Sequence, residues 1–94
     1  MERKRIHAIV HGSVQGVAFR EYTRRQGVRL GLSGWVRNRP DGTVETAFEG
    51  PPAQTDALLE WLATGSPYAR VLRVDSAEEQ PTGTTDGFFI EFFP

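Results

Sequence analysis

The sequence contains no cysteine and no long hydrophobic segment. The absence of cysteine excludes disulfide bonds and thiolate metal sites, so the hydrophobic core has to supply the stability of the fold. No apolar stretch is long enough for a transmembrane helix, and none follows the basic N-terminus as it would in a signal peptide. We therefore expect a cytoplasmic protein without a membrane partner.

The charge is distributed unevenly, although the net charge is only −1. Residues 1–39 carry nine basic and two acidic side chains, whereas residues 40–94 carry two basic and ten acidic ones. The basic half fits a locally positive cleft for an anionic substrate. A length of 94 residues, with 38% hydrophobic and 24% charged residues, predicts one small globular domain over residues 1–94.

The most informative segment is the glycine-bearing run GSVQGVAFR at residues 12–20. It separates an apolar run that predicts a strand over residues 5–11 from a helix expected to begin at Phe19. A glycine-bearing turn at a helix N-terminus directs several backbone N–H groups toward one point, which favours an anion. Arg20 adds a planar cation that suits phosphate oxygens. The segment therefore predicts a phosphate-binding loop.

The familiar phosphate loops do not fit this segment. A Walker loop needs Gly-Lys-Ser/Thr, but Val17 and Ala18 follow Gly16. The dinucleotide fingerprint needs three glycines in its own spacing, and thiol phosphatases need a cysteine. Taken alone, the segment also fits a plain strand-to-helix turn that ends in a surface arginine.

The rest of the chain predicts an alternation of strands and helices. Helices are expected over residues 19–30 and 53–64, and strands over residues 33–38, 43–49, 69–77 and 88–93, with a polar loop at residues 80–87. The order strand–helix–strand–strand–helix–strand implies helices packed on one face of an antiparallel sheet.

A second segment, GWVRNRPDGTVETAFEG at residues 34–50, helps to interpret the loop. Together the two segments closely resemble the acylphosphatase family. The first matches its Gly-x-Val-Gln-Gly-Val-x-Phe-Arg pattern at every defined position, although Ala18 stands where many members have glycine. The second matches a glycine–aromatic–small–basic–Asn pattern, followed by Gly-x-Val and a closing glycine. Residues 65–71 also resemble the family's loop into a later strand, so the resemblance covers nearly the whole chain.

The resemblance implies an α+β ferredoxin-like sandwich, with two helices on one face of a four- to five-stranded, mainly antiparallel sheet. It implies that Arg20 binds a phosphate group and that the amide of Asn38 orients the attacking water. The backbone N–H groups implied to complete the phosphate site belong to Gln15, Gly16, Val17, Ala18 and Phe19. The expected partner is a small-molecule acyl phosphate, without a cofactor, a metal or nucleic acid, and the expected state is a monomer.

Acyl phosphate hydrolysis suits a site without a catalytic histidine or a pair of carboxylates. The leaving group is a carboxylate, which is stable near neutral pH, so no strong general acid is required. The remaining work is to hold the phosphoryl group, neutralise its charge and aim a water molecule in line. An N–H cradle, one arginine and one amide side chain are sufficient for that work.

Several alternatives remain open from the sequence. Asn38 also fits a structural turn residue before Pro40. His7 and His11 lie on one face of a strand, but no third metal ligand is evident, so we expect a strand-face or surface role. At the level of function, a non-enzymatic anion-binding or regulatory module and an RNA-binding domain are the alternatives. Residues 43–49 lack the aromatic motif that RNA-binding sheets of this architecture carry.

Overall fold

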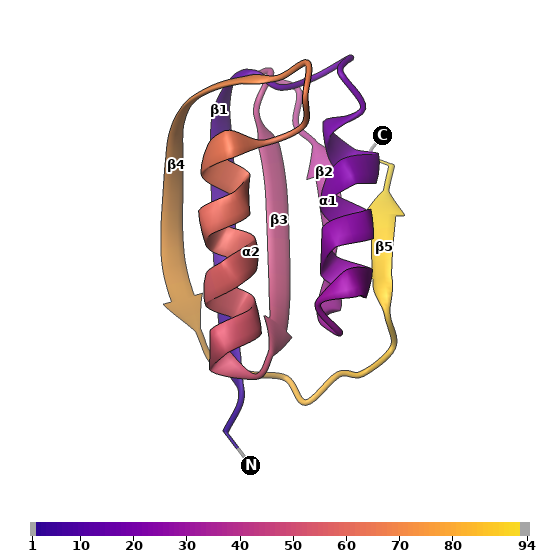
Figure 1. Ribbon diagram of the computed structural model, residues 1–94, viewed down its shortest axis with the longest axis vertical. Helices are drawn as coiled ribbons and strands as arrows, with labels where there is room; N and C mark the ends of the chain where they lie inside the picture. Colours follow the sequence, from indigo (N-terminus) through magenta and orange to yellow (C-terminus); the bar gives the residue numbers. More distant parts are fainter. Residues whose placement is uncertain (1, 93–94) are drawn as a thin grey trace.

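The computed structural model describes residues 2–92, which form five strands and two helices (Figure 1). In chain order they are β1 (Lys4–Ser13), α1 (Phe19–Arg29), β2 (Ser33–Asn38), β3 (Val44–Gly50), α2 (Pro52–Thr64), β4 (Arg70–Glu79) and β5 (Phe88–Glu91). Each lies within a few residues of the range predicted from the sequence. The last strand ends at Glu91 rather than at Phe93, which lies outside the described residues.

The strands form one sheet in the order β4-β1-β3-β2-β5. Neighbouring strands run antiparallel, except that β5 pairs with β2 in parallel. Both helices cover the same face: α2 packs on β1, β3 and β4, whereas α1 packs on β2 and β5 (Figure 1). The predicted α+β sandwich, with two helices on one face of a mainly antiparallel sheet, is therefore confirmed.

Residue alternation along the strands explains which face the helices cover. Val44, Thr46 and Phe48 of β3 point to the helices and are fully buried. Alternate residues of β1 also point to that side and meet them in the core. The strand predicted over residues 43–49 thus alternates with a period of two between the core face and the opposite face of the sheet. Among residues 2–92, no helix is both long and apolar enough to cross a membrane.

A glycine lets α1 approach the edge of the sheet closely. Gly27 is buried on the inner side of α1, where a Cβ atom would overlap the ring of Phe88 from β5. The interior helical glycine, which costs about 1 kcal/mol relative to alanine, is required here by packing. It seats α1 and the short strand β5 against each other.

The face of the sheet away from the helices, which we call the open face, carries paired charges. Its most buried member is Glu49 of β3, whose side chain is 0% exposed. Oε1 of this carboxylate accepts hydrogen bonds from Arg5 and from the hydroxyl and N–H of Thr82, at 2.6–3.0 Å. Oε2 accepts from the N–H of Gly83 at 2.9 Å and from Arg3 at 3.1 Å. This arrangement fastens the β4–β5 connection to β3.

The hydrogen bonds to Glu49 determine its charge state. Burial acts to raise its pKa, but the bonds from Thr82, Gly83 and Arg3 outweigh burial and lower the pKa to about 2. The carboxylate is therefore charged throughout the neutral range. Because it holds the segment that leads into β5, Glu49 helps to fix that strand beside β2.

Candidate active site

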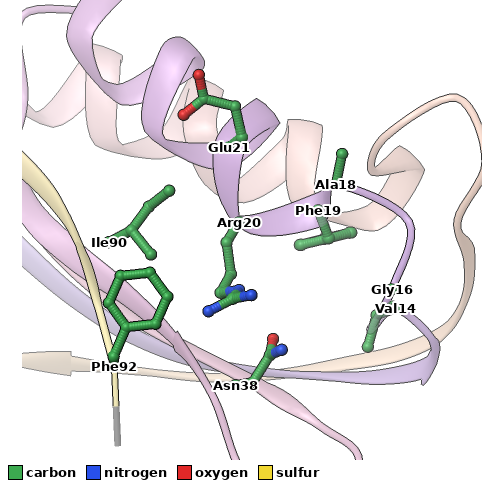
Figure 2. Close-up of a pocket in the computed structure, with 9 residues that line it drawn as sticks. All are labelled: Val14, Gly16, Ala18, Phe19, Arg20, Glu21, Asn38, Ile90 and Phe92. Atoms are coloured by element: carbon green, nitrogen blue, oxygen red, sulfur yellow. The ribbon is translucent and has the colours of Figure 1, made fainter.

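Three strands end at the same end of the sheet, where a pocket forms. The ends of β1, β2 and β5 lie together at the top of Figure 1, beside the connection from β1 to α1. The pocket there has a volume of about 150 Å³. Its lining consists of Val14, Gly16, Ala18, Phe19, Arg20, Glu21, Asn38, Ile90 and Phe92 (Figure 2).

The loop between β1 and α1 is anchored at both ends by buried apolar residues. Val14 and Phe19 are each 1% exposed. Between them, Gly16 has φ +73°, a conformation that side chains rarely adopt, and it provides the turn of the loop. Ala18 is also left-handed, with φ 59° and ψ 23°, although it carries a Cβ.

The left-handed Ala18 is the N-cap of α1, and no side chain caps this helix end. The first N–H groups of a helix have no partner within the helix and carry a partial positive charge. Since Ala18 supplies no side-chain acceptor, these donors are available to an anion. Of the N–H set predicted from the sequence, Ala18 and Phe19 lie at this helix N-terminus, and residues 15–17 lie in the loop that leads to it.

Two side chains fix the loop to its neighbours. Nε2 of Gln15 donates to the carbonyl oxygens of Arg39 and Thr43, both at 2.8 Å. The buried hydroxyl of Ser66, in the α2–β4 connection, donates to the carbonyl oxygen of Val17 at 3.0 Å. The side chain of Gln15 therefore binds the β2–β3 turn. This contact is compatible with the prediction that Gln15 binds phosphate through its backbone N–H.

Arg20 lies in the first turn of α1, and its guanidinium group enters the pocket (Figure 2). It lies over the ring of Phe92, 5.2 Å from the ring centre. Within residues 2–92, no carboxylate or other hydrogen-bond acceptor of the protein pairs with it. The cation is therefore available for an anionic ligand.

The nearest acid in sequence is occupied elsewhere. Glu21 accepts hydrogen bonds from Arg24 at 2.7 Å and from Arg25 at 3.1 Å, and in Figure 2 its carboxylate points away from Arg20. The hydrogen bond from Arg24 is the largest cause that lowers the pKa of Glu21 to about 2. Two other arginines thus hold the one pocket-lining acid, and the charge of Arg20 is not neutralised by it.

Asn38 ends β2, and its amide points toward the guanidinium of Arg20 (Figure 2). Its Oδ1 atom is buried and, among the described residues, has no hydrogen-bond partner. A buried acceptor without a donor typically costs about 1–3 kcal/mol, and such atoms are rare in folded proteins. The pocket therefore contains an acceptor that a bound donor would satisfy.

The two histidines lie on the open face, away from this pocket. Nε2 of His7 is 2.6 Å from Glu45, and Nε2 of His11 is 2.9 Å from Asp75. In the described part of the chain, no group of three potential metal ligands gathers. The expected strand-face role of the histidines is thus confirmed.

Of the predicted site residues, Gly16, Ala18, Phe19, Arg20 and Asn38 line the pocket. Gln15 and Val17 belong to the same loop but do not line the cavity. Sequence reasoning missed Val14 and Glu21 beside the loop, and Ile90 and Phe92 at the C-terminal end of the described chain. Ile90 and Phe92 come to the loop because β5 pairs in parallel with β2.

The chain is similar to known proteins over nearly its whole length. It matches the acylphosphatase family over residues 6–90. An acylphosphatase of Thermococcus kodakarensis is 49% identical over 88 residues, which cover 94% of this chain and 96% of that protein. An acylphosphatase of Pelotomaculum thermopropionicum is 47% identical over 92 residues, which cover 98% and 100%.

Solved structures agree with this match. The structure of an acylphosphatase from Coxiella burnetii has a TM-score of 0.90 and 37% sequence identity, and the match covers 95% of this chain and 93% of that chain. The crystal structure of acylphosphatase from Bacillus subtilis has a TM-score of 0.89 and 34% identity, with 94% and 98% covered. The resemblance seen in two sequence motifs is confirmed, and the chain belongs to the acylphosphatase family of hydrolases.

Proposed function

We propose that this chain hydrolyses acyl phosphates to a carboxylate and inorganic phosphate, by in-line attack of water at phosphorus. The observation that carries the proposal is the pairing of two unsatisfied groups in one pocket. Among the residues that the structure describes, Arg20 is a cation without a counter-ion, and Oδ1 of Asn38 is a buried acceptor without a donor. A phosphate group and a water molecule satisfy both.

The phosphoryl group binds between the loop and Arg20. Its oxygens accept hydrogen bonds from the planar guanidinium and from the backbone N–H groups of residues 15–19. These donors are fixed before the substrate arrives, because Gln15 and Ser66 anchor the loop to the neighbouring segments. Preorganised donors of this kind stabilise the charge that the phosphoryl oxygens carry in the transition state.

Asn38 positions the nucleophile. A water O–H donates to Oδ1 of Asn38, which directs a lone pair of the water toward phosphorus. The P–O bond to the acyl group breaks, and its electrons leave with the carboxylate. This leaving group requires no proton, and the proton released by the water ends on inorganic phosphate. The pocket therefore needs no general acid, and it has no histidine among its lining residues.

The finer parts of the proposal concern the state of the protein and its partners. The 94 residues act as one monomeric, cytoplasmic domain that uses no cofactor or metal. An RNA-binding role is disfavoured because the open face carries Glu45, Glu49, Asp75 and Glu79 among its arginines. These carboxylates pair with the arginines of that face, which leaves less positive charge for a nucleic-acid backbone.

Hydrolysis of benzoyl phosphate, with and without a chelator, tests the proposal. We expect activity that the chelator does not change, and little activity on phosphate monoesters, because an alkoxide leaving group needs an acid that this pocket lacks. Equal activity on acyl phosphates and monoesters would contradict the mechanism. Loss of activity on chelation would contradict the metal-independent part of it.

A further inference from the structure

The pocket has an apolar side that the binding of phosphate does not use. Ile90 of β5 and Phe92 just beyond it line the same cavity as Arg20 and Asn38. In Figure 2 they lie on the side of Arg20 away from Val14 and Gly16 of the loop. The cavity thus has Arg20 and Asn38 between the loop and an apolar side at the end of β5.

The ring of Phe92 is unusually accessible for an aromatic side chain. It is 80% exposed, and it lies over the guanidinium of Arg20 with 5.2 Å between the guanidinium carbon and the ring centre. A phosphate held by that guanidinium therefore lies next to the ring. A group attached to the phosphate through one oxygen atom reaches the face or edge of the ring that is still open.

We infer that Phe92, with Ile90 beside it, is the subsite for the acyl group and selects aryl and other apolar acyl phosphates over small ones. This inference rests on the proposed function and names its substrate class. Ring–ring contact and removal of apolar surface from water favour an aromatic acyl group at this position. An acetyl group is too small to cover the ring.

Because Phe92 can bind the acyl group by apolar contact, that side of the pocket needs no polar group. The pocket-lining acid, Glu21, is held by Arg24 and Arg25 and points away from the cavity (Figure 2). The lining on that side therefore discriminates by apolar contact rather than by hydrogen bonds.

The test compares two substrates in matched variants. The ratio of kcat/KM for benzoyl phosphate to that for acetyl phosphate is measured for the wild type, Phe92→Ala, Phe92→Leu and Phe89→Ala. Phe89 is the control because it is another exposed aromatic residue near the C-terminal end of the described chain, but it lines a different cavity. Comparing this ratio between each variant and the wild type cancels the difference in intrinsic reactivity of the two substrates, and the ratio itself cancels any common loss caused by a less ordered Arg20.

We expect Phe92→Ala to lower the ratio about five- to tenfold, Phe92→Leu to lower it less, and Phe89→Ala to leave it unchanged. An unchanged ratio in Phe92→Ala, even with lower activity on both substrates, would overturn the inference. So would an equal fall of the ratio in Phe89→Ala.

A binding measurement separates this inference from the proposed hydrolysis. Phenylphosphonate and methylphosphonate are titrated into the wild-type protein and Phe92→Ala and followed by NMR. We expect the wild type to bind phenylphosphonate several-fold more tightly than methylphosphonate, and the difference to disappear in Phe92→Ala. If the wild type shows this preference but does not hydrolyse benzoyl phosphate, only the proposed function is contradicted. If the wild type binds both phosphonates equally, the inferred subsite is overturned.

Discussion

Replacing Asn38 by alanine should separate catalysis from folding, because the structure gives the side chain an unpaired buried oxygen. If Asn38 aims the attacking water, its loss affects mainly the transition state. Removal of one preorganised polar group of this kind lowers kcat by about 10²–10³. The proposed phosphate site consists of Arg20 and backbone N–H groups, so the inhibition constant of inorganic phosphate should remain within about twofold.

The same substitution should not destabilise the protein. Oδ1 of Asn38 is buried and has no partner within residues 2–92, and such an acceptor costs about 1–3 kcal/mol. Removing it eliminates that cost while also removing some packing contacts of the amide. We therefore expect the free energy of unfolding of Asn38→Ala to equal that of the wild type or to exceed it by about 1 kcal/mol.

Steady-state kinetics on benzoyl phosphate and urea unfolding followed by circular dichroism measure the two effects. Gln80→Ala is a suitable control, because it removes an exposed amide that follows β4 and lies outside the pocket. A destabilised Asn38→Ala with nearly normal kcat would show that Asn38 is a structural turn residue. Weaker phosphate binding with normal kcat would place the amide in the anion cradle instead.

The remaining predictions concern the cation, the buried carboxylate and the loop. Arg20→Lys, which keeps the charge but loses the fork, should raise the inhibition constant of phosphate and lower kcat, whereas Arg29→Lys on the exposed end of α1 should change neither. Glu49→Gln should reduce the free energy of unfolding by about 2–3 kcal/mol at neutral pH. Because the folded-state pKa of Glu49 is lowered from 4.5 to about 2, this difference should be full above pH 4.5 and vanish as the pH falls toward 2, as denaturant titrations at several pH values will show. Ala18→Gly should raise the free energy of unfolding by about 0.5–1 kcal/mol in the same assay, because it relieves a left-handed alanine, and a loss of stability would refute that reading.

The sequence predicted most of the fold because its signals are local. The alternation along residues 43–49, the turn at residues 39–42 and the glycine after residue 64 each act within a few residues. The loop could also be predicted from the sequence. Gly16 permits the sharp turn because glycine has no side chain, and the planar cation of Arg20 suits phosphate oxygens. Asn38 required the family resemblance, since an asparagine before a turn has a common structural explanation.

What the sequence could not show depends on distant contacts. Glu49 occupies a position that alternation assigns to the open side of a strand, yet the segment at Thr82 and Gly83 folds over it and buries it completely. Ile90 and Phe92 join the pocket only because β5 returns parallel to β2. Neither pairing has a local signal, so the apolar side of the pocket appears only in the folded structure.

The strained or unpaired groups of this small domain and its stabilising contacts lie in different places. The left-handed Ala18, the unpaired oxygen of Asn38 and the unpaired cation of Arg20 all lie at one end of the sheet, around one pocket. The first two cost the folded state about 1 kcal/mol each, and all three are features that an anionic substrate and a water molecule would use. The multiply bonded Glu49 lies on the open face, outside the lining of that pocket, and fastens the connection that leads to β5. A site that works by positioning needs polar groups that have no partner until the substrate binds. Because this chain has no disulfides, other contacts, such as those of Glu49, must keep its strands in place and so hold these groups in position.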